Sequence, residues 1–274
     1  TYSVTATDVD AGDALVITAS TIPGWLQLED NGDGTGSLEG TPLNENVGNH
    51  SIVLKVTDES GAFAIQSFTI TVENTNDVPV FTSEAVTAAT EDAIYSYSVT
   101  ANDVDAGDAL ELSAPTLPAW LDFSDNGDGT GTLSGTPLND QAGDHEVELL
   151  LIDITGATGI QSFTITVENT NDAPVFSSEA VTAATEDVVY NYSVTAADVD
   201  AGDALVITAS TIPGWLQLED NGDGTGTLEG TPENPDVGDH AVVLRVTDGS
   251  GVFAVQSFTI TVENTNDVPV FTSE

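Results

Sequence analysis

The sequence has 274 residues, of which 46 are acidic and only two, Lys55 and Arg245, are basic, so the formal net charge is −44. Nucleic acids and anionic membrane surfaces are recognised mainly through Lys and Arg, so neither is an expected partner. The absence of Cys excludes a disulfide framework, a thiolate metal site and a cysteine nucleophile. No apolar run approaches the roughly 18 residues that a membrane-spanning helix needs, so we expect no membrane insertion.

The composition nevertheless predicts a folded protein. Hydrophobic residues make up 39% of the chain and occur in short alternating runs, unlike those of an acidic disordered tail. Self-repulsion of so many carboxylates opposes a compact state unless salt or bound cations screen it. Divalent cations are therefore the favoured partners.

The chain repeats itself with a period of 95 residues, which aligns Trp25, Trp120 and Trp215. Asn-Thr-Asn-Asp segments at 74–77, 169–172 and 264–267 precede Pro and mark natural junctions. We therefore predict a first module at 1–78, a second at 79–173, a third at 174–268 and the start of a fourth at 269–274.

The first module is expected to differ from the others, because residue 1 aligns with residue 96. A counterpart of residues 79–95 would then be missing, which leaves an open sheet edge. Residues 269–274 of another molecule are judged too short to fill this edge well. We expect higher mobility in residues 1–78 and a hazard of swapping between nearly identical modules.

Apolar residues alternate with polar ones along the third module, and no helical period of useful length is present. Phe253 and Val255 fall in the opposite phase to Phe258, so we expect a bulge near Gln256. About 95 residues with seven short strands predict an all-β fold of tandem Ig-like Greek-key β-sandwiches. The expected strands are 174–183, 188–196, 204–209, 215–219, 225–229, 239–247 and 252–263.

Asp198, Asp200 and Asp203 place three carboxylates within six residues, directly after a predicted strand. Alternate carboxylates in an irregular loop can converge on one hard cation, and Ca²⁺ accepts six to eight oxygen ligands with tolerant geometry. The pattern therefore favours a calcium site, with a solvated acidic loop as the alternative.

Several segments together resemble cadherins. Residues 168–176 are similar to the linker between cadherin domains, residues 194–200 to the strand and Asp-x-Asp loop, and residues 245–251 to the third calcium motif. Glu91 and Glu186 stand where cadherins have an early glutamate.

With residues 117–121 and 134–137, this pattern is similar to the dystroglycan-type cadherin-like repeats that are common in giant bacterial surface adhesins and RTX-type adhesins. The resemblance covers all three modules and implies cadherin-like sandwiches arranged end to end. It also implies an extracellular or cell-surface location in a bacterium.

The resemblance implies calcium ligands at each junction between modules. They are Glu91, Glu168, Asn171, Asp172, Asp198, Asp200 and Asp248 at the second junction, and Glu73, Asn76, Asp77, Asp103, Asp105 and Asp153 at the first. The first junction lacks an early glutamate and is expected to bind more weakly. The linker aspartate of cadherins is a glutamate here, and their mid-module acidic motif is replaced by Gly-Thr-Pro, so we expect fewer than three ions per junction.

Other acidic positions are open to two interpretations. Residues 30–36 and their counterparts at 125 and 220 resemble the start of an EF-hand loop, but no Glu stands at the twelfth position. Asn-Gly and Asp-Gly between apolar runs favour a plain hairpin turn, with an accessory Ca²⁺ site as the alternative. Asp13, Asp108 and Asp203 are either ligands or turn or capping residues.

The recurring aromatic residues do not indicate catalysis. Trp25, Trp120 and Trp215 are expected to pack on the core, with a sugar-stacking platform as the alternative. His50, His145 and His240 occur once per module and are expected to be structural. No grouping of Ser, His and Asp and no phosphate-binding loop recurs, so we do not expect an enzyme.

We therefore predict calcium-rigidified spacer repeats of a large secreted or cell-surface adhesin that supports cell adhesion. The expected partners are calcium ions, neighbouring identical modules and, through other regions, glycans or a host cell surface. Two alternatives stay open: a carbohydrate- or partner-binding module repeated for avidity, and homophilic cadherin-like adhesion.

Overall fold

The computed structural model describes residues 1–10, 12–200 and 202–272. Within these ranges the regular structure is β-strand, apart from three single-turn 3₁₀ segments, η1 (Asn44–Asn46), η2 (Asn139–Gln141) and η3 (Asn234–Asp236). The predicted all-β class is confirmed. No helix in the described part of the chain is long and apolar enough to cross a membrane. Residues 273–274 of the predicted fourth module lie outside the described residues.

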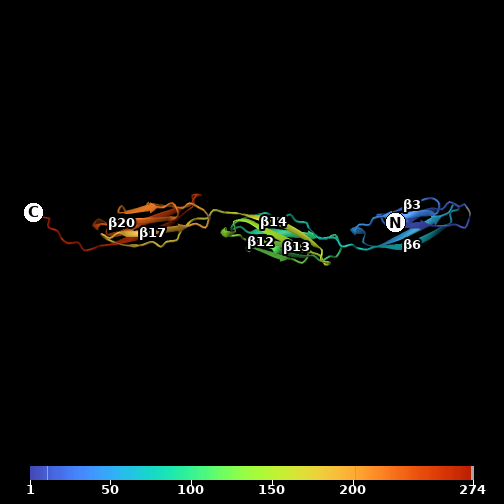
Figure 1. Cartoon of the computed structure of the whole chain (residues 1–274), viewed down its shortest axis with the longest axis horizontal. Coiled ribbons are helices and arrows are strands. Elements are labelled where there is room, and N and C mark those ends of the chain that lie inside the picture. The colour runs from blue at the N-terminus through green and yellow to red at the C-terminus, as the bar shows by residue number, and fades with distance from the viewer. Residues whose placement is uncertain (11, 201, 273–274) are drawn as a thin grey trace. The chain divides into compact units, whose positions relative to one another are not determined.

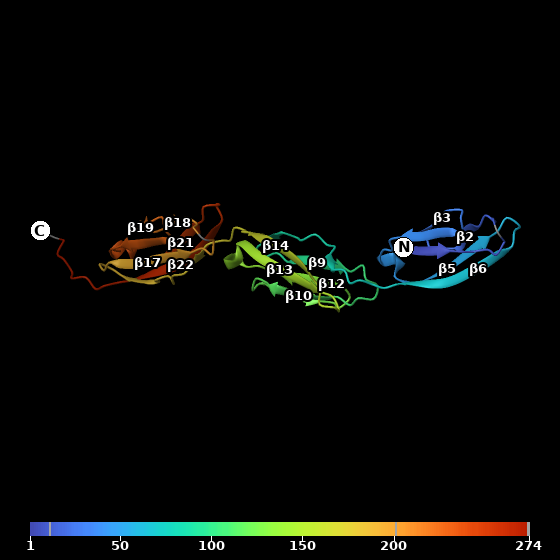
Figure 2. The same ribbon diagram turned by 45° about the vertical axis from the view of Figure 1, so that its right-hand side comes forward.

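The strands form three β-sandwiches, each built from two sheets (Figures 1 and 2). In the first, one sheet has the order β1 (Tyr2–Thr5), β4 (Thr35–Gly40), β3 (Leu26–Asp30), and the other β2 (Val16–Thr21), β5 (Gly48–Thr57), β6 (Phe63–Val72). In the second sandwich, one sheet has the order β11 (Leu121–Asp125), β12 (Thr130–Gly135), β9 (Tyr95–Asn102), β7 (Val80–Phe81). Its other sheet has the order β10 (Glu111–Thr116), β13 (Gly143–Ile152), β14 (Thr158–Glu168), β8 (Ala88–Thr90).

In the third sandwich, one sheet has the order β15 (Val175–Phe176), β17 (Tyr190–Ala197), β20 (Thr225–Gly230), β19 (Leu216–Asp220). Its other sheet has the order β16 (Ala183–Thr185), β22 (Phe253–Glu263), β21 (Gly238–Thr247), β18 (Val206–Thr211).

The chain divides into two compact units. One holds residues 1–87, 96–135 and 146–165, and the other holds residues 88–95, 136–145 and 166–274. The linker at 74–77 and the aspartates that it contacts belong to the first unit. The linker at 169–172 and its contacts belong to the second.

The core of the third sandwich follows from the period of two along its strands. Tyr190, Tyr192 and Val194 are the buried alternate residues of β17, and Leu244 and Val246 are two of the three on β21 of the facing sheet. Each fully buried aliphatic side chain of this kind contributes about 1.5–3 kcal/mol relative to exposure. The core fixes both sheets and therefore the loops at their ends.

The bulge expected near Gln256 is wrong. β21 and β22 pair without a register shift from Gly238↔Val262 to Thr247↔Phe253, so Phe253 stays on the outer face. The Arg245 guanidinium lies 3.8 Å from the centroid of the Phe253 ring and covers it there, so the aromatic side chain does not have to enter the core. The register shift of this sheet lies instead between Ala209 and Thr211 of β18.

The opening segment of the third sandwich is shared between both sheets, whereas the sequence predicted one strand over 174–183. Its first part, β15, pairs antiparallel with β17, and its second part, β16, pairs parallel with β22. β7 and β8 take the same places in the second sandwich. This division brings residue 186, directly after β16, beside the end of β22.

Candidate calcium junctions

The linker before the third sandwich is bonded to two aspartates of that sandwich. The side-chain amide of Asn171 donates to Oδ2 of Asp248 at 2.9 Å, and the backbone N–H of Asp172 donates to Oδ2 of Asp200 at 2.6 Å. Asp200 and Asp248 are both buried. The linker is therefore closed over two carboxylates that follow β17 and β21.

The first junction has the same arrangement. The side-chain amide of Asn76 donates to Oδ2 of Asp153 at 2.8 Å, and the backbone N–H of Asp77 donates to Oδ2 of Asp105 at 2.7 Å. Asp105 and Asp153 are also buried. Two junctions of the chain thus form the same hydrogen bonds between equivalent residues.

The Asp-x-Asp loop gathers further carboxylates beside these bonds. Asp200 donates its N–H to Oδ1 of Asp198 at 3.0 Å, and Asp203 brings its carboxylate within 4.8 Å of both. The Oδ2 atoms of Asp198 and Asp203 are buried and accept no hydrogen bond from the described residues. In this loop, Ala201 is outside the described residues.

The equivalent loop of the second sandwich has the same unsatisfied oxygens. Asp103, Asp108 and Asp153 place carboxylate oxygens within 4.8 Å of one another. Within the described part of the chain, Oδ2 of Asp103 and of Asp108 is buried and accepts no hydrogen bond. Buried carboxylate oxygens are costly without a donor or a cation. A donor set made only of oxygens, with unsatisfied lone pairs, fits Ca²⁺.

The carboxylates differ in proton affinity according to their neighbours. Burial, followed by repulsion from Asp198, Asp248 and Asp200, raises the pKa of Asp203. The hydrogen bond from Asn171 is the main reason that the pKa of Asp248 is lowered.

The pKa values of the aspartates at the first junction differ in the same way. The pKa of Asp108 is raised by burial and by neighbouring aspartates, whereas the bond from Asn76 lowers the pKa of Asp153 to about 2. Asp153 and Asp248, whose pKa values are lowered, therefore stay ionised at neutral pH, and Asp108 and Asp203 have the higher proton affinity.

Glu91 of the second sandwich contacts the beginning of the linker that precedes the third sandwich. Glu91 is buried, donates its N–H to the carbonyl of Glu168 at 2.9 Å and accepts the N–H of Thr170 at 3.0 Å. Its carboxylate lies within 4.8 Å of those of Asp92 and Asp172. Glu91 can therefore join linker residues in holding a cation.

The side chains of two predicted ligands do not lie among the junction carboxylates. Glu73 and Glu168 are exposed, and Glu168 contributes its backbone carbonyl to Glu91 instead. The other predicted residues lie at their junctions. These are Asn76, Asp77, Asp103, Asp105 and Asp153 at the first, and Glu91, Asn171, Asp172, Asp198, Asp200 and Asp248 at the second.

Sequence reasoning missed an asparagine in each 3₁₀ segment. Asn139 donates to Oδ1 of Asp200 at 3.0 Å and to Asp172 at 3.5 Å, and Asn44 makes the equivalent contacts to Asp105 and Asp77. These residues lie two positions after Thr-Pro in each repeat, so the recurring Thr-Pro-x-Asn was the signal that could have found them.

Asp92, also absent from the predicted set, has a positive φ of 57°. This left-handed conformation is tolerated by Asp better than by most non-glycine residues. It is held by the bond from the Asp92 N–H to the carbonyl of Pro137 at 2.9 Å. Asp187 has the same conformation in the third sandwich.

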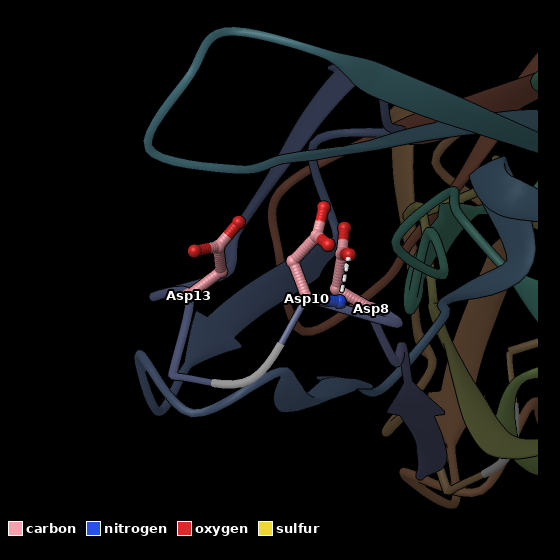
Figure 3. A group of neighbouring side chains, drawn as sticks. All are labelled: Asp8, Asp10 and Asp13. Atoms are coloured by element: carbon pink, nitrogen blue, oxygen red, sulfur yellow. Dashed lines mark hydrogen bonds between the residues drawn. The ribbon is translucent and has the colours of Figure 1, made fainter.

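The first sandwich has the Asp-x-Asp loop with no linker over it in the described part of the chain. Figure 3 shows Asp8, Asp10 and Asp13 with their carboxylates on the same side of the loop, and the N–H of Asp10 donates to Asp8 at 2.9 Å. Asp8 and Asp10 are exposed, whereas Asp105 and Asp200 are buried. The linker contacts therefore account for the burial of the equivalent residues in the other two sandwiches.

The Asn-Gly-Asp-Gly segments form the turns of β-hairpins, as the favoured interpretation predicted. Asp33 accepts hydrogen bonds from the N–H and hydroxyl of Thr35, and Asp30 accepts those from the N–H groups of Gly32 and Ile17. Gly32 and Gly34 have the positive φ angles that such a turn needs. The Asp33 carboxylate is thus used within the turn, and the Asp30 carboxylate also binds β2.

The aromatic residues pack on the core. Trp215 makes edge contacts with the rings of Tyr190 at 5.9 Å and His240 at 5.8 Å. The ring Nε2 of His240 donates to the carbonyl of Asp236 at 2.6 Å, and His50 donates in the same way to Asn46. These contacts agree with the structural interpretation of the Trp and His residues.

A family model described as "Putative Ig domain" (He_PIG) matches residues 1–73, 78–168 and 173–263. No curated protein matches the chain. Among solved structures, the extracellular cadherin domains 1–5 of protocadherin gamma B2 are 15% identical with a TM-score of 0.58, over 93% of this chain and 54% of that chain. The extracellular domain of protocadherin gamma B4 is 20% identical with a TM-score of 0.51, over 91% and 43%. At these identities the likeness shows the fold alone.

An endo-fucoidan hydrolase from glycoside hydrolase family 107 is 28% identical over 92% of this chain. The TM-score of this match is 0.36. The chain spans 39% of the length of that enzyme and 54% and 43% of the two protocadherin structures.

Proposed function

This chain belongs to the He_PIG family of Ig domains, and from that premise we propose that it is a run of calcium-rigidified spacer repeats from a large secreted or cell-surface adhesin. The family and the cadherin-like fold support an adhesion-type extracellular repeat. The further placement among dystroglycan-type repeats of bacterial RTX-type adhesins rests on the sequence resemblance. The function is that of a non-enzymatic module.

One observation carries the proposal. At both junctions, buried carboxylate oxygens that lack a hydrogen-bond donor among the described residues lie beside aspartates that are bonded to the linker. They belong to Asp103 and Asp108 at the first junction and to Asp198 and Asp203 at the second. A solvated acidic loop would leave such oxygens in water, and a hairpin turn would satisfy them, as it does for Asp33. A hard cation satisfies several of them at once.

The proposed ligands extend the set predicted from the sequence. At the second junction Asp198, Asp200, Asp203 and Asp248 would hold one ion together with the linker, and Glu91, Asp92 and Asp172 would hold another. At the first junction the residues equivalent to Asp198, Asp200, Asp203 and Asp248 are Asp103, Asp105, Asp108 and Asp153, and these would hold one ion. Bound Ca²⁺ supplies positive charge that offsets the repulsion within each group.

Such binding would couple the linker to the sandwich that follows it. Without the cation, the linker is held mainly by single bonds such as those from Asn171 and Asp172. With the cation bound, ligands from the linker and from the sandwich that follows it share one ion, so the linker has fewer accessible conformations. Extracellular modules bind Ca²⁺ at about 10⁻⁴ to 10⁻³ M, so the stiff state would form outside a cell.

Isothermal calorimetry with Ca²⁺ tests the proposal directly. We expect the double variant Asp198→Asn, Asp200→Asn to lose calcium bound at the second junction. The matched control is Asp8→Asn, Asp10→Asn, which changes the same motif where both residues are exposed. Equal stoichiometry in the wild-type protein and the Asp198/Asp200 variant would rule the proposal out.

A carbohydrate-binding module is a second candidate, supported by one pocket. It has a volume of about 350 Å³ and is lined by Trp215, Gln217, Glu219, Thr227 and Glu229, among others. An aromatic edge with amide, hydroxyl and carboxylate groups can bind a sugar. Glycan-array binding that is lost in Glu229→Ala without loss of stability would favour this candidate.

A further inference from the structure

The two basic side chains of the sequence occupy equivalent positions on the outer faces of two sheets. Lys55 lies in β5 and Arg245 lies in β21, two repeat periods further on. The Nζ of Lys55 lies 4.5 Å from the centroid of the Phe63 ring, and the Cζ of Arg245 lies 3.8 Å from that of Phe253. In the described part of the chain, neither cation forms an ion pair with a carboxylate, although acidic residues outnumber basic ones 46 to 2. An intramolecular ion pair therefore does not account for either cation.

Exposed apolar side chains surround each cation. In the third sandwich Arg245 pairs with Val255, and the neighbouring row of the same face joins Val206, Thr247 and Phe253. The three apolar side chains are each about half exposed. Lys55 has the same surroundings in the first sandwich. We call this surface the cationic face, and it consists of Val206, Val243, Arg245, Phe253 and Val255 in the third sandwich and of Val16, Val53, Lys55, Phe63 and Ile65 in the first.

The equivalent face of the second sandwich carries the opposite charge. The inner residues of β13 are apolar like their equivalents in β5 and β21, so the difference lies in the outer residues. Three positions of this face hold glutamate where the other sandwiches hold uncharged residues, and leucine takes the position of the cation. Together with the exposed Ile160 they form what we call the acidic face, which consists of Glu111, Glu146, Glu148, Leu150 and Ile160.

The acidic face is hollowed beside Glu148. The hollow has a volume of about 310 Å³ and is lined by Glu146, Glu148, Thr116, Ser162 and Thr164, among others. The register shift of β10 lies at its edge, because this shift sets Thr116 opposite Glu148. The lining residues carry two carboxylates and three hydroxyl groups that can accept hydrogen bonds. Such a set fits a guanidinium or an ammonium group, because charge-assisted hydrogen bonds to carboxylates are among the strongest in proteins.

We propose that the acidic face of the second sandwich binds the cationic face of the third sandwich of a second copy of this chain. Arg245 of the second copy enters the hollow between Glu146 and Glu148, while its apolar neighbours pack against Leu150 and Ile160. The contact is sheet against sheet, with one charged anchor inside an apolar surface. It does not involve the junction carboxylates, so it is independent of the proposed calcium sites.

Arg245 can keep its contact with Phe253 in this complex. Stacking on the ring uses the flat face of the guanidinium, whereas its N–H bonds point outward in the plane of the group. The Nε of Arg245 is buried and has no acceptor among the described residues, so the two terminal nitrogens are the ones that reach a partner. Lys55 offers a single charged nitrogen on the same kind of face, so the first sandwich should bind more weakly.

Charge favours the pairing of unlike faces. Two cationic faces would bring the Arg245 side chains of both copies together, and two acidic faces would bring their glutamates together. Like charges that face each other across an interface are disfavoured, and this repulsion sets the choice of partner. The net charge of −44 on each copy adds a repulsion between whole chains, which physiological salt limits to a range of about 8 Å. The association is therefore weak and reversible.

Sedimentation equilibrium of the full chain, at constant calcium and ionic strength, measures this association. The variant Lys55→Glu, Arg245→Glu leaves only acidic faces, and the variant Glu146→Lys, Glu148→Lys makes the second face cationic like the other two. Each variant should associate with itself about tenfold or more weakly than the wild-type protein, because like charges then meet. An equimolar mixture of the two variants should associate again, because unlike faces are once more available.

The matched control is Glu29→Lys, Glu39→Lys. It makes the same change in net charge at exposed positions on the other sheet of the first sandwich, so it should not weaken the association. Melting curves check that every variant is folded, since all the changed side chains lie on outer faces. In the wild-type protein, the methyl signals of Leu150, Ile160 and Val255 should shift as the concentration rises.

Three results would overturn the proposal. The first is a wild-type chain that stays monomeric at millimolar concentration. The second is a mixture of the two folded charge variants that fails to associate. The third is a control variant that loses as much association as the variants of the two faces.

Discussion

The side chain of Asn171 donates a hydrogen bond of 2.9 Å to Asp248, which lies 77 residues further along the chain. Asn76 makes the same bond to Asp153 at 2.8 Å, over the same separation in sequence. Each bond holds the linker before a sandwich against the loop that follows one of its longest strands, β21 or β13. At each junction the linker and the following sandwich therefore contribute residues to the same site.

Replacing Asn171 with Ala should weaken calcium binding at the second junction by about tenfold, because residues that orient a ligand typically affect metal affinity by 10- to 100-fold. The pKa of Asp248 should rise towards its ordinary value when the bond from Asn171 is lost. Calorimetry measures the affinity. The control is Asn266→Ala, whose side chain bonds to the backbone of Asp267. Equal effects of both variants would contradict the assigned role.

Calcium binding should depend on pH through Asp108 and Asp203. Their pKa values in the folded, calcium-free protein are raised above 3.8, so both bind protons more readily than an ordinary Asp. The destabilisation that burial and repulsion cause in the ionised form is present above the raised pKa and is relieved as the pH falls through it. Since Ca²⁺ binds the ionised carboxylates, its affinity should fall over the same range.

Calorimetry in two buffers of different ionisation enthalpy measures the proton release that this linkage requires. Binding should release more protons at mildly acidic pH than at neutral pH, because the two carboxylates bind protons more readily than an ordinary Asp. Asp203→Asn should remove the contribution of the second junction. Affinity that stays constant between these pH values would contradict the pKa shifts.

The hairpin turns should not bind calcium. Asp128 accepts the N–H and hydroxyl of Thr130, which lowers its pKa and uses its carboxylate within the turn. Asp128→Ala should lower the melting temperature by a few degrees because these bonds are lost. It should leave the number of bound ions unchanged, and the loss of an ion would show that the loop is a site.

The third sandwich should depend strongly on Leu244, which is fully buried between its sheets. Leu244→Ala should lower the free energy of unfolding by about 2–5 kcal/mol, and Val255→Ala on the exposed face of β22 by about 0.5 kcal/mol or less. Denaturation can be followed through Trp215 in a chain where Trp25 and Trp120 are Phe. Similar effects of the two variants would contradict the assigned core.

The repeat and the strand alternation predicted the fold class because both depend on local sequence. The resemblance also named Asn171 and Asp200, which the structure places together at the second junction, and their role as calcium ligands stays a prediction. Asn139 was missed because its contact with Asp200 spans 61 residues, and the recurring Thr-Pro-x-Asn marks its position without showing what it contacts. The bulge near Gln256 was wrong because the period of two does not reveal that Arg245 can cover an outward-facing Phe253.

The length of the opening strand was also not predictable from composition. Residues 174–183 are suitable for one strand throughout, yet only Val175 and Phe176 pair with β17 before the chain crosses to the other sheet. The crossing depends on the geometry of two facing sheets, which the segment itself does not encode.

Small-angle X-ray scattering of the full chain with millimolar Ca²⁺ and after chelation tests the central claim most directly. If the junction carboxylates are structural ligands, chelation should broaden the conformational ensemble, and the variant Asp198→Asn, Asp200→Asn should show part of that broadening even with calcium present. The variant Asp8→Asn, Asp10→Asn should scatter like the wild-type protein. An identical profile with and without calcium would contradict calcium-dependent stiffening of the junctions.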